Sequence, residues 1–200
     1  MEQEGKFIAI YGINNLGKTR QATILKEALE GQGLETIGFK YPIYDLEPTG
    51  PEINAVLRQG VPMQERDLQG LYARNRRDFE PTLLGHLSRG KWVVAEDYTG
   101  TGIAWGMAGK IPLLDLEKMN SGLLQENLAI LLYGERFLQS REENHRNEAD
   151  DVKCERARVT HLFLAERYGW KKVFANQSWE EVHRDIWQIV AEKFNLKNHD

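Results

Sequence analysis

The chain has 200 residues, of which 41% are hydrophobic and 28% charged, and its formal net charge is −4. This length and composition suit one folded domain over residues 1–200 and exclude a disordered chain. The acidic balance argues against a nucleic-acid partner, and the apolar runs are too short for a membrane span, so we expect neither. Cys154 is the single cysteine and the N-terminus lacks a secretory pattern, so we expect a cytoplasmic protein.

Short apolar runs alternate along the chain with longer segments of helical spacing. The first run, residues 6–12, precedes a helical pattern at 21–33 that ends in glycines. Further apolar runs lie at 35–42, 91–98, 128–134 and 171–177, and further helical patterns at 66–90 and 178–194. Ser178 and Glu181 have the spacing of a capping box at the start of the last helix. Strands alternating with helices of this length predict an α/β fold, with a five-stranded parallel sheet flanked by helices.

The stretch YGINNLGKTRQ follows the first predicted strand and contains the P-loop pattern G-x-x-x-x-G-K-[ST]. Its glycines let backbone N–H groups converge on phosphate oxygens, and the following helix adds its partial positive charge. We therefore expect ATP here, with Lys18 at the β- and γ-phosphates and the Thr19 hydroxyl on Mg²⁺. The predicted nucleotide-binding residues of this loop are Gly12, Asn14, Asn15, Leu16, Gly17, Lys18, Thr19 and Arg20.

Residues 136–158 interrupt the apolar rhythm with a high density of charges of both signs. Two interpretations fit this segment. One is a solvated pair of helices stabilised by ion pairs along each helix. The other is a mobile flap that closes over a charged ligand.

Beyond the P-loop, three stretches resemble the thymidylate kinase family of nucleoside monophosphate kinases. Residues 71–105 resemble its acceptor helix and third strand, and residues 145–186 its lid, last strand and final helix, while FKYP at 39–42 resembles its second strand. The resemblance runs nearly end to end. It implies the P-loop NTPase fold, a lid at about 136–158, an acceptor-binding region at about 40–110, phosphoryl transfer from Mg·ATP to dTMP, and a homodimer.

The resemblance also implies roles for single residues at the acceptor base. Tyr72 stands where the family stacks an aromatic ring on this base, and Arg76 where an arginine reads the carbonyl edge of the base. Residues four apart share one face of a helix, so a ring and a guanidinium can meet one planar base. Trp105 matches a family aromatic near the acceptor sugar and base. Core packing is the alternative for Tyr72 and Trp105, and a solvated position is the alternative for Arg76.

Two further groups follow from the resemblance. The lid arginines Arg136, Arg141 and Arg146 are candidates to clamp the transferring phosphoryl group, because the P-loop carries no arginine. We favour Arg141 and Arg146 for this role. Ala175 and Gln177 lie in a stretch similar to the family loop that borders the adenine of ATP.

The sequence departs from the family pattern around the acceptor phosphate. Asn14 replaces the acidic P-loop residue that meets the acceptor sugar, and Tyr44 stands at the position of a phosphate-binding arginine. The Asp-Arg dipeptide after the third strand is Glu96-Asp97. Glu96 can still help hold Mg²⁺ beside Thr19, but Asp97 inverts the charge of an arginine expected at a phosphate. The predicted catalytic residues are Lys18, Glu96, Asp97, Arg141 and Arg146.

Three interpretations of these departures remain open. In the first, the acceptor is dTMP or another nucleotide, and other cations bind its phosphate. The candidates are Lys40, Arg74 and Arg77. In the second, the acceptor is a deoxynucleoside, and a carboxylate activates its 5′-hydroxyl. The candidates are Asp45, Glu47 and Asp97. In the third, the protein binds nucleotide without catalysis, although the intact Lys18, Thr19 and Glu96 argue against this.

Overall fold

The computed structural model describes residues 4–137 and 150–197 of the chain. Five strands form one sheet in the order β2-β3-β1-β4-β5, and every neighbouring pair is parallel. The strands are β1 Phe7–Tyr11, β2 Thr36–Lys40, β3 Trp92–Glu96, β4 Leu128–Tyr133 and β5 Lys171–Phe174. The predicted α/β fold is confirmed, with each of the five predicted strands in place.

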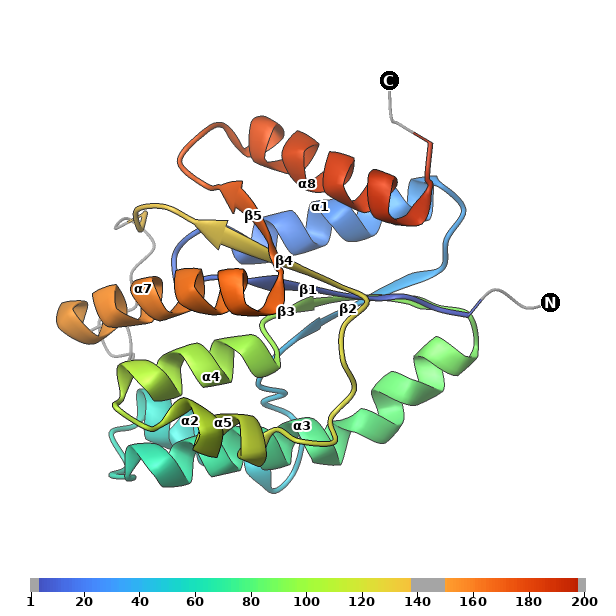
Figure 1. Ribbon diagram of the computed structural model, residues 1–200. Helices are drawn as coiled ribbons and strands as arrows, with labels where there is room; N and C mark the ends of the chain where they lie inside the picture. Colours follow the sequence, from blue (N-terminus) through green and yellow to red (C-terminus); the bar gives the residue numbers. More distant parts are fainter. Residues whose placement is uncertain (1–3, 138–149, 198–200) are drawn as a thin grey trace.

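Helices cover both faces of the sheet (Figure 1). Those in the described residues are α1 Lys18–Gly31, α2 Thr49–Arg58, α3 Glu65–Ser88, α4 Thr99–Ala108, α5 Leu113–Met119, α7 Asp151–Tyr168 and α8 Trp179–Phe194. Figure 1 shows α1 and α8 on one face, and α3, α4, α5 and α7 on the other. The three helical patterns in the sequence correspond to α1, α3 and α8. The sequence did not predict the shorter helices α2, α4 and α5. None of the helices in the described ranges is both long and apolar enough to cross a membrane.

The central strand β1 is buried along its whole length. Ile8 and Ile10 face the core beneath α1 and α8, whereas Phe7, Ala9 and Tyr11 face the core on the opposite side. Successive side chains of a strand point to opposite faces, so a strand with helices on both sides must be apolar throughout. The continuous apolar run that predicted β1 therefore reflects burial on both faces.

The strand order places the P-loop at the point where the sheet changes direction. From β1 the chain proceeds to β2 and β3 on one side and later to β4 and β5 on the other. Parallel sheets bind ligands in the crevice outside the carboxyl ends of the strands at such a point. The loop after β1 lies there, and α1 begins at its last residues, with Gly17 as N-cap in the left-handed conformation (φ 79°).

Two helix termini bear on the sequence predictions. The capping box at the start of α8 is confirmed, because the Ser178 and Glu181 side chains each bond the backbone of the other. Helix α7 begins after Asp150, whose side chain caps Lys153 N at 2.8 Å, so residues 151–158 of the predicted lid form its first turns. Arg141 and Arg146 lie outside the described residues.

Candidate active site

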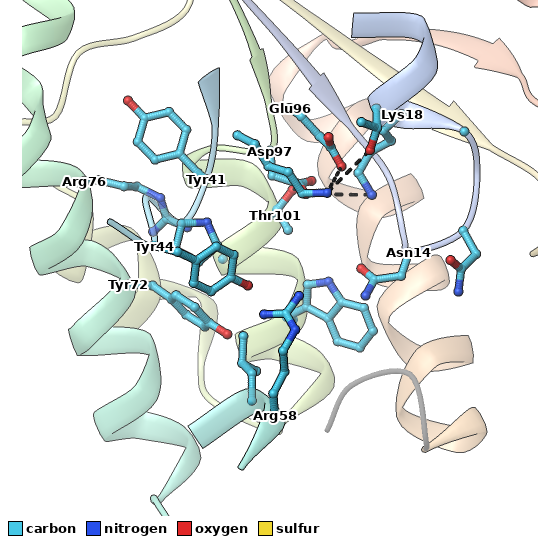
Figure 2. A pocket seen from close by; sticks show the side chains of 18 of the residues that line it. Asn14, Lys18, Tyr41, Tyr44, Arg58, Tyr72, Arg76, Glu96, Asp97 and Thr101 are labelled. Carbon is cyan, nitrogen blue, oxygen red and sulfur yellow. Dashed lines mark hydrogen bonds and ion pairs between the residues drawn. The ribbon is translucent and has the colours of Figure 1, made fainter. Parts of the chain in front are cut away.

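A cavity of about 400 Å³ opens at the carboxyl ends of β1, β2 and β3. Its walls come from the P-loop, from the segments that follow β2 and β3, and from helices α2, α3 and α4 (Figure 2). The site residues predicted from the sequence that line it are Asn14, Asn15, Gly17, Lys18, Thr19, Arg20, Tyr44, Tyr72, Arg76, Glu96, Asp97 and Trp105. The structure therefore brings the predicted ATP loop and the predicted acceptor residues into one cavity.

The backbone of the P-loop adopts conformations that its glycines permit. Gly12 has a φ of 144°, and a Cβ atom there would lie 2.6 Å from the carbonyl oxygen of Leu132. Asn15 and Gly17 also have positive φ angles, of 63° and 79°. Glycine adopts such angles without the steric cost that other residues meet. Gly12 also lies so close to β4 that a side chain at this position would clash with the strand.

Lys18 is almost completely buried and folds back over the loop that carries it. Its ammonium donates to the carbonyl oxygens of Gly12 and Ile13, both at 2.9 Å, and lies 3.8 Å from the Asp97 carboxylate. A buried ammonium needs such partners, because an unpaired charge in the protein interior is costly. The interactions hold the Lys18 charge at the mouth of the P-loop, next to the end of β3.

The predicted magnesium ligands Thr19 and Glu96 share a cation supplied by the protein. The Lys40 ammonium lies 3.0 Å from Glu96 Oε1 and donates to Thr19 Oγ1 at 3.4 Å. Burial disfavours the charge on Lys40, but the neighbouring Glu96 outweighs it, so the pKa of Lys40 is raised. Carboxylate and hydroxyl oxygens are the ligands that Mg²⁺ prefers. With a stand-in cation already on both oxygens, Thr19 and Glu96 fit a magnesium site.

Asp97 follows β3 with a φ of 63° and turns its carboxylate toward α4 and the P-loop. It accepts a hydrogen bond from Thr101 Oγ1 at 2.6 Å, in addition to its approach to Lys18. Burial raises the pKa of Asp97 to about 6, although Lys18 and Thr101 oppose the shift. The contacts of Asp97 are thus with the cation and hydroxyl of neighbouring elements.

The aromatic and basic residues predicted at the acceptor base line the other end of the cavity. Tyr72 and Arg76 project from α3, and Trp105 from α4, and all three are buried. Tyr72 also belongs to the apolar cluster between α2 and α3, so it both packs in the core and lines the cavity. Gly102 leaves room for the guanidinium, because a Cβ there would lie 2.7 Å from Arg76 Nη2.

Arg76 has an incomplete set of partners. Its Nη1 donates to Asn120 Oδ1 at 3.0 Å, whereas its Nε is buried with no hydrogen-bond partner in the described part of the chain. Burial lowers the pKa of Arg76. Because Arg76 lines the cavity and Asn120 fixes one side of its guanidinium, the remaining N–H groups of the fork are suited to bind an acceptor oxygen of a ligand.

Several cavity residues had no predicted role from the sequence, and Arg58 and Phe137 are two of them. Arg58, at the end of α2, lies with its guanidinium 4.9 Å from the ring centroid of Tyr44, and both side chains line the cavity. Phe137 also lines it, and its backbone N–H donates to the P-loop carbonyl of Asn15 at 2.8 Å. Had helix α2 been predicted from the sequence, Arg58 would have been recognised as part of its last turn.

Other candidates lie away from the cavity. Arg74 pairs with Asp78 on the surface, and Arg77 donates to the carbonyl oxygens of Met119 and Ser121 at the end of α5. Of the three cations suggested for the acceptor phosphate, Lys40 alone lines the cavity. Among the suggested carboxylate bases this is true only of Asp97, because Asp45 and Glu47 are exposed on the loop after β2.

Leu16 and Arg20 of the P-loop region, and Ala175 and Gln177, which were predicted near adenine, make contacts within the protein. Arg20 stacks over the ring of Trp179 at 4.2 Å, which joins α1 to α8. Ala175 is buried and donates its N–H to Tyr133, and Gln177 bonds Asp185, so neither lines the cavity. Leu16 is buried in the core beneath α1.

A parallel five-stranded sheet with a P-loop at its switch point, and a cavity shared by that loop and a buried tyrosine and arginine, is the arrangement of a P-loop kinase. Comparison with known proteins narrows the class. A sequence model of the family described as thymidylate kinase matches residues 10–186. The chain therefore belongs to the thymidylate kinase family.

Individual relatives agree with this assignment. The chain is 30% identical to a thymidylate kinase of a Synechococcus strain over 96% of the chain and 98% of that protein. It is 24% identical to a putative thymidylate kinase of Invertebrate iridescent virus 6 over 100% of the chain and 93% of that protein. A solved structure of thymidylate kinase from Candida albicans, described as revealing the origin of broad substrate specificity, matches the fold with a TM-score of 0.83. That structure shares 20% sequence identity and covers 98% of this chain and 96% of its own.

Proposed function

We propose that this protein transfers the γ-phosphoryl group of Mg·ATP to the 5′-phosphate of dTMP. One observation carries the proposal: a single cavity holds Lys18 and Thr19 of the P-loop at one end, and Tyr72 and Arg76 at the other. A donor polyphosphate on the loop and an acceptor base between the ring and the guanidinium would leave the two phosphates facing one another. In-line transfer needs this arrangement, and positioning supplies most of the catalysis in such enzymes.

At the donor end, the P-loop amides and Lys18 would bind the polyphosphate. Lys18 must then exchange the carbonyl oxygens of Gly12 and Ile13 for phosphate oxygens. Thr19 and Glu96 would hold magnesium, which would neutralise negative charge on the phosphates during transfer. Arg141 and Arg146 of the lid stay our candidates for the cation that reaches the transferring group. Ala175 and Gln177 stay candidates for the border of the adenine site.

At the acceptor end, thymine would stack on Tyr72 with its carbonyl edge toward Arg76. Two observations support this role: Arg76 lines the cavity, and the contact of its Nη1 with Asn120 fixes the direction of the guanidinium. Trp105 would form the wall near the sugar, and Asn14 would face the sugar from the P-loop. For the phosphate we propose Arg58, which reaches the cavity beside Tyr44 at the position where the family pattern has an arginine.

A deoxynucleoside acceptor is the second candidate, and Asp97 is the observation that favours it. This carboxylate lines the cavity at the end of β3, and its pKa of about 6 suits a general base near neutral pH. A 5′-hydroxyl needs such a base, whereas a phosphate oxygen does not. However, Asp97 already interacts with Lys18 and Thr101, which gives it a role in holding these side chains. We therefore place dTMP before a deoxynucleoside as the acceptor.

The acceptor is tested by measuring ADP release from Mg·ATP with a panel of acceptors. The panel contains dTMP, thymidine, dUMP and the other deoxynucleoside monophosphates, because a relative of broad specificity is known. We expect dTMP to give the largest kcat/KM. Stimulation by thymidine alone would reject the proposal in favour of a nucleoside kinase. Nucleotide binding by calorimetry without transfer to any acceptor would indicate a protein that has lost catalysis.

We also propose that the protein acts as a homodimer in the cytoplasm, without nucleic acid. The family resemblance supports the dimer, and the free, buried Cys154 is compatible with a reducing compartment. Sedimentation velocity at micromolar concentration is expected to give twice the mass of the 23.1 kDa chain. A species of 23.1 kDa would contradict it.

A further inference from the structure

Lys40 occupies the position between the two oxygens assigned to magnesium. Its ammonium is 3.0 Å from Glu96 Oε1 and 3.4 Å from Thr19 Oγ1. Glu96 is almost buried, whereas the Lys40 side chain is 56% exposed. The carboxylate is thus held by the end of β3, and the cation reaches it on a long, flexible and accessible stem.

The ammonium and a metal ion cannot use these oxygens together. Mg²⁺ binds oxygen at about 2.0–2.1 Å and needs a nearly complete octahedron, most of it from waters and phosphates. An ammonium in contact with both Glu96 and Thr19 lies within that coordination shell. Two cations at this separation would also repel one another strongly. Binding of the metal therefore requires Lys40 to leave.

The cavity offers Lys40 a second position. Lys40 is the last residue of β2 and lines the cavity on the side that continues to Tyr44. Around the acceptor phosphate Tyr44 and Asp97 stand where the family pattern has arginines, so Arg58 alone does not balance the two negative charges of the phosphate and a second cation is needed. A lysine stem allows its ammonium to move several ångströms by rotation about side-chain bonds alone.

We propose that Lys40 is an exchangeable counter-cation: it holds the metal position until Mg²⁺ arrives with ATP, and then moves to the 5′-phosphate of the acceptor. The acceptor half of this exchange rests on the proposed function, whereas the metal half requires only nucleotide binding. The exchange makes the two substrates interdependent. Mg·ATP releases a positive charge for the acceptor phosphate, and by linkage the acceptor favours metal binding.

The metal half is tested with Mn²⁺ as the probe and protein saturated with a non-hydrolysable ATP analogue. Electron paramagnetic resonance of free Mn²⁺ gives the affinity in the wild type, K40M, K40R and K26M. K40M is expected to bind Mn²⁺ roughly 5- to 10-fold more tightly, the size of one partly exposed ion pair. K40R keeps the competing charge and is expected to resemble the wild type.

K26M is the matched control, because Lys26 pairs with Glu30 at 2.7 Å on α1 and does not line the cavity. It makes the same change of charge and shape as K40M. An unchanged Mn²⁺ affinity in K40M would overturn the proposal. Equal tightening in K26M would show a general effect of charge and would overturn it as well.

The acceptor half is tested by calorimetric titration of dTMP and thymidine, with and without the magnesium complex of the ATP analogue. In the wild type this complex is expected to strengthen dTMP binding about 10-fold, as expected for one charge-assisted hydrogen bond. In K40M this gain should disappear, while thymidine, which has no phosphate, should bind both proteins equally. A full gain in K40M would overturn the acceptor half. Wild-type protein that binds thymidine but not dTMP would reject the proposed function and this half together, while the Mn²⁺ titration still decides the metal half.

Discussion

The two ends of the cavity are built in different ways. The donor end is built on one contiguous loop, in which Gly12, Asn15 and Gly17 set the backbone and the amides are expected to bind phosphate. The acceptor end is assembled from side chains of α2, α3 and α4, which come together only in the folded chain. The family pattern is kept by Tyr72, Arg76 and Trp105 around the acceptor base, and the departures, at Asn14, Tyr44 and Asp97, gather around the acceptor phosphate. Backbone geometry tolerates few substitutions, whereas a side-chain site can be rebuilt from other positions.

The two ends also differ in how charge is balanced. At the donor end Lys18 approaches Asp97, and Lys40 pairs with Glu96, so each cation has a carboxylate. At the acceptor end the nearest described partner of the buried Arg76 is the neutral amide of Asn120. A buried charge is costly unless a counter-charge or hydrogen bonds compensate it. The lysines of the donor end are thus paired with carboxylates before nucleotide binds, whereas Arg76 at the acceptor end has a neutral partner.

The largest expected effect tests the donor end. Lys18→Ala removes the cation of the P-loop and is expected to lower kcat by about 1,000-fold, because electrostatic stabilisation dominates phosphoryl transfer. ADP release with dTMP measures it, and circular dichroism checks the fold. Lys26→Ala, on the same helix and away from the cavity, is the control and should retain full activity. A loss of less than 10-fold in Lys18→Ala would remove Lys18 from the mechanism.

The features that the sequence predicted correctly are mostly those set by residues close together in the chain. The strands, the P-loop and the capping box could all be predicted, because each depends on residues adjacent or nearly adjacent in the chain. Tyr72 and Arg76 were found through the resemblance to the family, and their spacing agrees with it because it places them on one face of a helix. The structure places both in the cavity.

The rest depended on where side chains point. Arg77 follows Arg76 directly, yet it caps α5 on the surface, a destination that only the packing of α3 against α5 determines. Arg58 was missed because the short helix α2 was not predicted, and the direction of its last turn depends on how α2 packs against α3. The contact of Lys40 with Glu96 and Thr19 joins three elements and has no counterpart in local sequence.

The next largest effect is expected at the acceptor end, from substitution of Arg76. Arg76→Lys keeps the charge but loses the planar fork, so one ammonium cannot serve both Asn120 and the base. We expect the KM for dTMP to rise about 50-fold, with a smaller change in kcat, as for a lost charge-assisted bond. Arg77→Lys makes the same replacement one position later and should leave the KM unchanged. Equal effects of the two substitutions would contradict the base-reading role.

Asp97 allows a test of charge balance by pH. Burial raises its pKa from 3.8 to about 6, so between these values the folded protein holds a proton that the unfolded chain has released. Its contribution to the free energy of unfolding is therefore full below pH 4 and is lost as the pH rises through 6. Relative to Asp97→Asn, the wild type should lose about 2 kcal/mol between pH 4 and pH 7.

Urea denaturation of both proteins at intervals from pH 4 to pH 8 measures this difference. Asp45→Asn, at an exposed position of the loop after β2, controls for the removal of a carboxylate. A difference between wild type and Asp97→Asn that stays constant with pH, or that changes in the opposite direction, would contradict the raised pKa.

The smallest effect concerns the space that Gly102 leaves for Arg76. In Gly102→Ala the new Cβ would lie 2.7 Å from Nη2 and 3.0 Å from Nη1, so the guanidinium must shift by several tenths of an ångström. We expect the KM for dTMP to rise about 5-fold and the KM for ATP to stay unchanged, as for about 1 kcal/mol of misplacement. Gly70→Ala is the matched control, because a Cβ there meets nothing within 4 Å and the change affects only helix propensity.

The double variant with Arg76→Lys separates steric displacement from any other effect of Gly102. Lysine has no guanidinium at the crowded position, so the added methyl group has nothing to displace. The two changes together should then raise the KM for dTMP no more than Arg76→Lys alone, since they act through the same contact. Losses that add in full would mean that Gly102 affects the acceptor through a route other than Arg76, and the division between the two ends would have to be drawn elsewhere.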